Sequence, residues 1–224
     1  MMNRSLHALA GLTGLLSLGL AQAAEIPLYP TGPSEDAAFL RFVNAGEQVL
    51  ELKADGSGAS LRLEGAKHAS DYLTVPAGKP IKGSLSLNGQ QQALDVSVAP
   101  GEFATVVGIP AAQGLNLVTV REQPDDFNAL KASLALYSLD ASCTDAGLQA
   151  AGRNVDIFKG VANGSLQRRS INPLKLSVQL RCGGASVGAP VDLGELAAGQ
   201  RYTLFLLPSA QGPRLLQAED TLAN

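Results

Sequence analysis

The chain has 224 residues, of which 46% are hydrophobic, 4% aromatic and 17% charged, and its formal net charge is −3. A mildly acidic chain has no overall electrostatic attraction to nucleic acid or to acidic lipid, so composition excludes a general polyanion-binding role. We therefore expect no nucleic-acid partner.

Residues 1–23 have the pattern of a secretory signal peptide. Arg4 precedes an uncharged apolar run at 8–20, and the small residues Ala-Gln-Ala follow at 21–23. The run is shorter than the roughly 20 residues that span a bilayer, and no cysteine follows it to carry a lipid. The sequence predicts export with cleavage near Ala23, and no transmembrane segment in the mature chain. The alternative, an N-terminal membrane anchor, would need a longer apolar run.

Strand patterns dominate the first half of the mature chain. A β-type run at 38–46 is followed by two predicted hairpins, at 49–65 and 81–98. The first hairpin turns at Asp-Gly-Ser-Gly and the second at Asn88-Gly89, a dipeptide that tolerates the positive φ angles of a tight turn. Two further strands are predicted at 102–110, ending at Pro110, and at 115–123.

The second half repeats this order. A run at 132–140 corresponds to 38–46, and a hairpin with Gly183-Gly184 at its turn occupies 175–196. Strands at 201–208 and 214–220 then correspond to the last two strands of the first half. The segment 144–164 is the hardest to assign, and we expect a strand at 154–161 preceded by a loop.

The repeat is also visible in the identities of individual residues. "VAPGEFATVVGIP" at 98–110 returns as "LAAGQRYTLFLLP" at 196–208, with Ala, Gly, Thr and Pro kept at four positions. Units of about 100 residues have the size of small antiparallel sandwiches. The sequence predicts an all-β protein with two tandem β-sandwich domains, 24–123 and 124–224, separated near Pro124. One larger sandwich with an accidental repeat is the alternative.

The only two cysteines are Cys143 and Cys182. An exported protein meets an oxidising compartment, which favours a disulfide between them. Closing a loop of about 40 residues stabilises the fold by roughly 4 kcal/mol in the chain-entropy model. The alternative is a redox pair, but catalytic pairs usually have C-x-x-C spacing.

No catalytic or cofactor motif is visible. After the signal peptide the only histidine is His68, which we expect on a surface loop although Ser70 and Asp71 follow it. The chain has no G-x-S-x-G nucleophile motif, no P-loop and no dinucleotide-binding glycine pattern. The carboxylates are too scattered for a metal site. We predict a non-enzymatic protein without metal or cofactor.

Two groups of residues are candidates for partner or polymer contact. Arg168, Arg169 and Lys175 lie in the run 167–175, which we expect to be a loop before a strand. This loop either binds an acidic partner or a uronate polymer, or is simply solvated. Tyr29 and Tyr72 occupy loop-like positions where exposed rings could contact a sugar, although the absence of tryptophan argues against tight glycan binding.

Several of these stretches resemble the alginate O-acetylation protein family AlgF. The resemblance begins with Leu28 and Tyr29 and continues through an "A-F-x-R-x-x-N-A" strand, and three further stretches match over most of the mature chain. The strand residues are Ala38, Phe39, Arg41, Asn44 and Ala45, and the other stretches are 76–78, 99–107 and 171–180.

The resemblance implies a periplasmic accessory protein of exopolysaccharide O-acetylation with two β-rich domains. Such a protein works beside a membrane-bound O-acyltransferase and an SGNH-like periplasmic acetyltransferase, and the family offers no catalytic residue to transfer to this chain. The pair Cys143 and Cys182 corresponds to no family motif, and relatives also accompany cellulose acetylation, so the polymer stays open. A polysaccharide-binding or export module and an esterase using His68 are the alternative functions.

Overall fold

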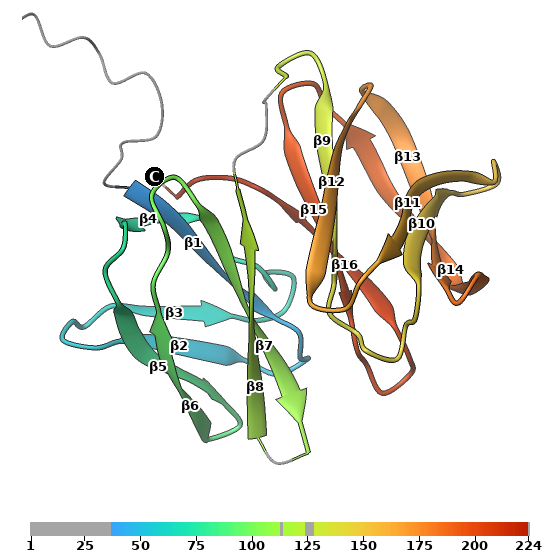
Figure 1. Ribbon diagram of the computed structural model, residues 1–224. Coiled ribbons are helices and arrows are strands. Elements are labelled where there is room, and N and C mark those ends of the chain that lie inside the picture. Colours follow the sequence, from blue (N-terminus) through green and yellow to red (C-terminus); the bar gives the residue numbers. More distant parts are fainter. Residues whose placement is uncertain (1–36, 113, 124–127, 224) are drawn as a thin grey trace, which may run out of the picture. The chain divides into compact units, whose positions relative to one another are not determined.

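The structure, a computed structural model, describes residues 37–112, 114–123 and 128–223, all within the compact unit Gly32–Asn224. The predicted signal peptide lies outside the described residues. Over the described ranges the chain is entirely β and turn, with strands β1–β16 in four sheets of four strands (Figure 1). In this part of the chain, no helix has the length and apolar character needed to cross a membrane.

The first two four-stranded sheets pack together as one β-sandwich. One sheet has the order β4-β1-β7-β8 and the other the order β3-β2-β5-β6. The strands are β1 (Ala37–Asn44), β2 (Leu50–Ala54), β3 (Ser60–Leu63), β4 (Leu73–Pro76), β5 (Ile81–Leu87), β6 (Gln90–Val96), β7 (Phe103–Ala111) and β8 (Gly114–Glu122).

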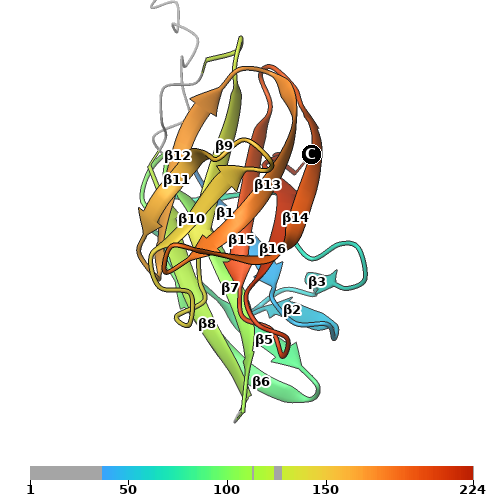
Figure 2. The ribbon, with the colours of Figure 1, turned by 90° about the vertical axis from the view of Figure 1, so that its right-hand side faces the viewer.

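The second pair of sheets forms another sandwich, with the orders β12-β9-β15-β16 and β11-β10-β13-β14. Figure 2 shows β10, β13 and β14 of the latter sheet together. The strands are β9 (Ala132–Ser138), β10 (Ala146–Ala150), β11 (Val155–Val161), β12 (Ser165–Ile171), β13 (Leu174–Cys182), β14 (Ala185–Leu196), β15 (Arg201–Leu207) and β16 (Arg214–Glu219).

The two sandwiches have the same topology strand for strand. In each, the first strand pairs in parallel with the seventh, β1 with β7 and β9 with β15, and every other pairing is antiparallel. The register is also the same, because Arg41 lies opposite Thr105 while Ala135 lies opposite Thr203, and the two threonines are equivalent in the repeat. The prediction of two tandem all-β units is confirmed, with one parallel pair in each that the sequence pattern did not indicate.

The predicted hairpins are present. β5 and β6 are joined by Asn88 and Gly89, with φ angles of 53° and 75°. β13 and β14 are joined by Gly183 and Gly184, with φ angles of 56° and 80°. Positive φ at both turn residues matches the right-handed twist of the flanking strands, which explains the residue types at both turns.

Two segments expected to be loops are strands. The basic run lies largely on β12, whose residues pair with β9 along its whole length from Ala132 to Ser138. The first part of 144–164 contains β10, which lies between β11 and β13. The prediction of loops was wrong for both segments. Polar residues on the edge strand β12 and a glycine in the bulged strand β10 obscure the alternating apolar pattern that marks a strand.

Each sandwich has its own apolar core, and a third apolar cluster joins them. The third cluster takes equivalent positions from the two repeats, since β1 and β7 contribute on one side and β9 and β15 on the other. Its buried members are Val43, Ala45, Val107, Ile109 and Val120 from the first sandwich and Ala135, Tyr137, Leu139, Phe205 and Leu207 from the second. The same face of each repeat is therefore buried against the other.

The C-terminal segment also crosses from the second sandwich to the first. The Tyr72 amide donates to the Thr221 carbonyl at 2.8 Å, and the Ala223 amide donates to the Tyr72 carbonyl at 2.9 Å. The Thr221 hydroxyl donates to the carboxylate of Asp71. The last residues thus extend the sheet beside β4.

We predict that ending the chain at Asp220 lowers the free energy of unfolding by about 1–3 kcal/mol, because two backbone hydrogen bonds and the Asp71 contact are lost. Urea denaturation followed by circular dichroism measures this. A chain ending at Ala223 is the matched control and should unfold like the full chain. Equal stability of all three would show that the crossing segment contributes nothing.

Candidate functional site

The most concentrated group of charged side chains in the described residues lies between the sandwiches. We call Arg41, Glu122, Arg168, Arg201 and Asp220 the interdomain ion network. The side chains of Arg41, Glu122, Arg168 and Asp220 are no more than 6% exposed, and that of Arg201 is 20% exposed. Charges buried to this extent are retained in proteins only when they are paired.

Arg41 is the centre of this network. It projects from β1, and its Nη1 donates to Asp220 Oδ1 at 2.6 Å. Its Nε donates to the Thr105 hydroxyl at 2.9 Å and its Nη2 to the Thr203 hydroxyl at 3.0 Å. One guanidinium therefore bonds the two equivalent threonines of the repeat, one from each sandwich.

Arg168 makes a second bridge across the interface. Its Nε donates to Glu122 Oε1, and its Nη2 donates to Glu122 Oε2 at 3.1 Å and to Asp220 Oδ2 at 2.8 Å. The Tyr137 hydroxyl completes the environment of Glu122 by donating to Oε2 at 2.7 Å. Glu122 and Asp220 are 98 positions apart, the same offset as Thr105 and Thr203, so the acids are repeat equivalents too.

Aromatic rings enclose the Arg41 guanidinium. Its central carbon lies 4.4 Å from the centroid of Tyr72, 4.9 Å from that of Phe205 and 5.6 Å from that of Tyr137. Such cation–π contacts stabilise a desolvated cation. The rings also exclude water, so the pairing with Asp220 is stronger than at a surface.

The ionisation of the network follows from this geometry. Burial alone would raise the pKa of Asp220, but the charges of Arg41 and Arg168 and the Thr203 hydrogen bond outweigh it, so the pKa lies below its usual value. Burial lowers the pKa of Arg41, but the charge of Asp220, the neighbouring Tyr72 and Tyr137 and the hydrogen bond to Asp220 together raise it above its usual value. Burial also raises the pKa of the Tyr137 hydroxyl well above its usual value, which keeps it a donor. Asp220, Arg41 and Arg168 are therefore charged at neutral pH.

We predict that Asp220→Asn lowers the free energy of unfolding by about 2 kcal/mol at pH 7, the size of a lost hydrogen-bonded charge. Because the folded-state pKa of Asp220 is depressed, its contribution is present above the unfolded-state value of about 3.9 and is lost as pH falls through the folded-state pKa. Urea denaturation at a series of pH values measures this. The difference in free energy of unfolding between the wild-type chain and Asp220→Asn should become smaller below about pH 4. Asp95→Asn is the control. Because the Asp95 side chain is 66% exposed, this variant should change the free energy of unfolding little at any pH.

Two predicted contact residues belong to this buried region, and the expectation that they are exposed is corrected. Tyr72 is 2% exposed because its ring lies over Arg41 and edge-on to Phe103, with centroids 5.0 Å apart. The Arg168 side chain is held by Glu122 and Asp220. Neither side chain is available to a polymer or a partner.

Of the remaining predicted contact residues, Arg169 and Lys175 do not lie with Tyr72 and Arg168 in this region. Arg169 is exposed, and its Nη1 donates to the Ile157 carbonyl at 2.9 Å. The Lys175 side chain is exposed and lies 3.9 Å from Asp192, on β13 rather than on a loop. Tyr29 lies outside the described residues. Arg169 and Lys175 remain accessible, but they do not form one site with Tyr72 and Arg168.

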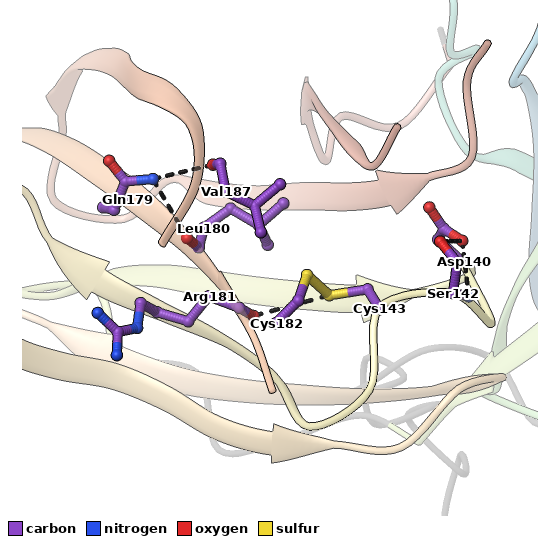
Figure 3. Close-up of a disulfide and its surroundings, with 8 residues drawn as sticks. All are labelled: Asp140, Ser142, Cys143, Gln179, Leu180, Arg181, Cys182 and Val187. Atoms are coloured by element: carbon purple, nitrogen blue, oxygen red, sulfur yellow. Dashed lines mark hydrogen bonds between the residues drawn. A yellow bond between two sulfur atoms is a disulfide. The ribbon is translucent and has the colours of Figure 1, made fainter. Parts of the chain in front are cut away.

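The predicted disulfide between Cys143 and Cys182 is present, with Cα atoms 4.9 Å apart (Figure 3). It joins the turn before β10 to the end of β13. On that turn, Asp140 Oδ1 accepts from the Ser142 amide at 2.9 Å and from its hydroxyl at 2.7 Å. The bond therefore fixes an ordered connection within the second sandwich.

The residues around His68 have structural partners. The Ser70 hydroxyl accepts from the Phe42 amide and donates to the Asp71 carbonyl, and the Asp71 carboxylate accepts from Thr221. His68 lies in the connection between β3 and β4, as expected, but it is half-buried beside β1, and its Nδ1 is buried without a hydrogen-bond partner. These three residues do not form a catalytic triad. Within the described ranges, no group of three or more His, Cys, Asp or Glu side chains could hold a metal.

Sequence reasoning missed Arg41, Glu122 and Asp220. Arg41 interrupts an otherwise apolar strand, and the acids recur at the repeat offset of 98 residues, so both signals were readable. The strand motif at 38–45, which suggested the family, includes a structural residue, because Asn44 Nδ2 donates to the carbonyls of Gln48 and Leu63.

The fold and the network define a class of protein: a duplicated β-sandwich whose halves are joined by equivalent apolar faces and a shared buried ion network. The comparisons with known proteins place it further. The family model for "Alginate O-acetyl transferase AlgF" matches residues 11–203, and the chain belongs to the AlgF family.

Curated relatives agree with this assignment. The chain is 30% identical over 209 residues to the alginate biosynthesis protein AlgF of Pseudomonas aeruginosa, a match covering 91% of this chain and 89% of that one. It is 28% identical over 203 residues to the alginate biosynthesis protein AlgF of Pseudomonas fluorescens, covering 90% and 86%. A solved structure of the C-terminal domain of the P. aeruginosa protein matches 40% of this chain and 98% of that domain, with 26% identity and a TM-score of 0.34.

Proposed function

We propose that this chain is a periplasmic, non-catalytic adaptor of alginate O-acetylation, which links a membrane-bound O-acyltransferase to an SGNH-like periplasmic acetyltransferase. The observation that carries the proposal is the family match, which extends along residues 11–203. The predicted signal peptide supports export, because an apolar run of that length with small residues after it is typical of cleaved leaders.

The non-catalytic part rests on how the described polar side chains are used. The buried charges hydrogen-bond one another across the interface, and Ser70 and Asp71 bond neighbouring backbone and side-chain groups. A covalent acetyl relay would need a nucleophile within hydrogen-bond reach of a base. The imidazole of His68 has no such neighbour at its buried Nδ1.

The rigid junction suits an adaptor. Two sandwiches joined by apolar packing, five charged side chains and a crossing C-terminal segment hold their surfaces in a fixed relation. A body of this kind binds two partners without losing much conformational entropy on association. A glycan-binding role has less support, because Tyr72, one of its two candidate rings, is buried.

The experiment is a binding measurement with purified proteins, combined with an activity assay. Surface plasmon resonance should detect a complex between the mature chain and the SGNH-like acetyltransferase. The chain alone should release no acetate from an acetyl ester above the buffer rate, and His68→Ala should change neither result. Ester cleavage that disappears in His68→Ala, with no complex formed, would overturn the proposal in favour of an enzyme.

A further inference from the structure

The chain contains two Asn-Gly dipeptides, and both lie at the tips of turns between strands. Asn88-Gly89 joins β5 to β6, and Asn163-Gly164 lies in the connection between β11 and β12. All four residues are exposed. Neither asparagine side chain has a hydrogen bond to any residue that the structure describes. The two sites therefore have the same local sequence chemistry and similar access to solvent.

An asparagine that precedes a glycine can lose ammonia without a catalyst. The backbone nitrogen of the glycine attacks Cγ of the asparagine, a new C–N bond forms, and the bond from Cγ to the side-chain nitrogen breaks. The proton of the glycine N–H leaves with that nitrogen as ammonia, and a five-membered succinimide ring remains. Water then opens the ring at either carbonyl, which gives aspartate or isoaspartate. Glycine favours ring closure because it has no Cβ to obstruct the approach.

The two sites differ in what holds the attacking nitrogen. The Gly164 amide donates to the carbonyl of the buried Ser138 at 2.8 Å. The same turn is fixed by Ser165, whose amide and hydroxyl donate to the Ala162 carbonyl at 3.1 Å and 2.7 Å. The Gly89 amide, by contrast, donates to no group among the described residues. Because the nitrogen must lose its proton to react, a hydrogen bond has to break first at Gly164 but not at Gly89.

The strands around the two turns differ in the same direction. Ring closure brings the glycine nitrogen onto Cγ, so each turn must open locally before it reacts. β6 is the outer strand of its sheet (Figure 1), and its first four residues, 90–93, are exposed. Opening the other turn separates the start of β12 from the buried end of β9 at Ser138. Local opening requires least free energy where the fewest buried contacts are lost, which favours the tip of the β5–β6 hairpin.

We propose that Asn88 is a site of spontaneous deamidation in the folded protein, and that Asn163 is protected from the same reaction. Either product adds one negative charge at the tip of the β5–β6 hairpin. Isoaspartate also adds a methylene group to the backbone of a two-residue turn. Since the length of such a turn sets the register of its strands, isoaspartate weakens the pairing of β5 with β6. This inference is independent of the proposed function.

The test follows both sites in the purified mature chain during incubation at mildly alkaline pH. Mass spectrometry of proteolytic peptides measures how much Asn88 and Asn163 has been converted at each time. Asn88 should be converted about two- to tenfold faster, the factor that corresponds to the net contribution of one hydrogen bond. The matched control is the same chain in concentrated urea, where both dipeptides are unfolded and the two rates should be similar. Circular dichroism should confirm that the incubated chain without urea is folded.

Each outcome decides the proposal. Faster conversion of Asn88 in the folded chain, with similar rates in urea, supports it. Equal rates in the folded chain, or faster conversion of Asn163, would overturn it, because the hydrogen bond of the Gly164 amide would then give no protection. Conversion of both sites in urea but of neither in the folded chain would also overturn it, and so would a preference for Asn88 that persists unchanged in urea.

Discussion

Replacing Arg41 with methionine should lower the free energy of unfolding by about 3–5 kcal/mol, the range for removing one partner of a buried ion pair. Methionine retains much of the side-chain volume but leaves Asp220 with only part of its charge compensation. It also leaves the hydroxyls of Thr105 and Thr203 without the donor that joins them. Arg168, which bonds the equivalent acids Glu122 and Asp220, is the second side chain in the described network that contacts both repeats through equivalent residues.

Urea denaturation of the mature chain at pH 7 is the measurement. Arg62→Met is the matched control, because Arg62 is also an ion-paired arginine, with Glu51 and Glu64 as partners, but its side chain is 55% exposed. Exposed pairs contribute about 0–1 kcal/mol, so the control should remain close to wild type. Similar losses in both variants would mean that burial of the Arg41 network has no special energetic role.

Removing the disulfide with Cys143→Ala and Cys182→Ala together should cost about 4 kcal/mol, because the bond closes a loop across 39 positions of sequence separation. Reduction of the wild-type protein should produce a similar loss, while the double variant should be insensitive to reductant. Denaturation curves with and without reductant make the comparison. A loss below about 1 kcal/mol would show that the connection before β10 is ordered by its hydrogen bonds alone.

The sequence allowed the architecture to be predicted where local chemistry determines it. Asn88-Gly89 and Gly183-Gly184 marked two hairpins, and the repeat of 98–110 at 196–208 marked the duplication. The parallel pairing of β1 with β7 was not predictable, because the partners are far apart in sequence and a strand buried on both faces lacks an alternating pattern. β12 was missed because its polar residues resemble a loop.

The site was less predictable than the fold. Arg168 looked like a surface cation because three basic residues stand close together in sequence, yet alternation along β12 sends its side chain into the interface and leaves Arg169 exposed. Tyr72 looked exposed because it precedes only a short strand. The partner that buries its ring, Arg41, lies 31 positions earlier in the sequence, a contact that only the folded sheet creates.

The interface has a consequence for how the two halves of this chain behave. Each sandwich covers the other with the face that its own repeat would otherwise expose, so the two halves act as one body and not as separate modules on a linker. Such a body is compatible with the proposed adaptor role, which needs binding surfaces held in one arrangement.

The most direct test of the proposed adaptor function is the acetyl content of the exopolysaccharide from a strain lacking this chain, measured together with the sugar composition of the polymer. If the chain is an adaptor of alginate O-acetylation, acetyl groups are lost while a uronate polymer is still made, and the wild-type chain restores them. Unchanged acetylation in the deletion strain would contradict the account.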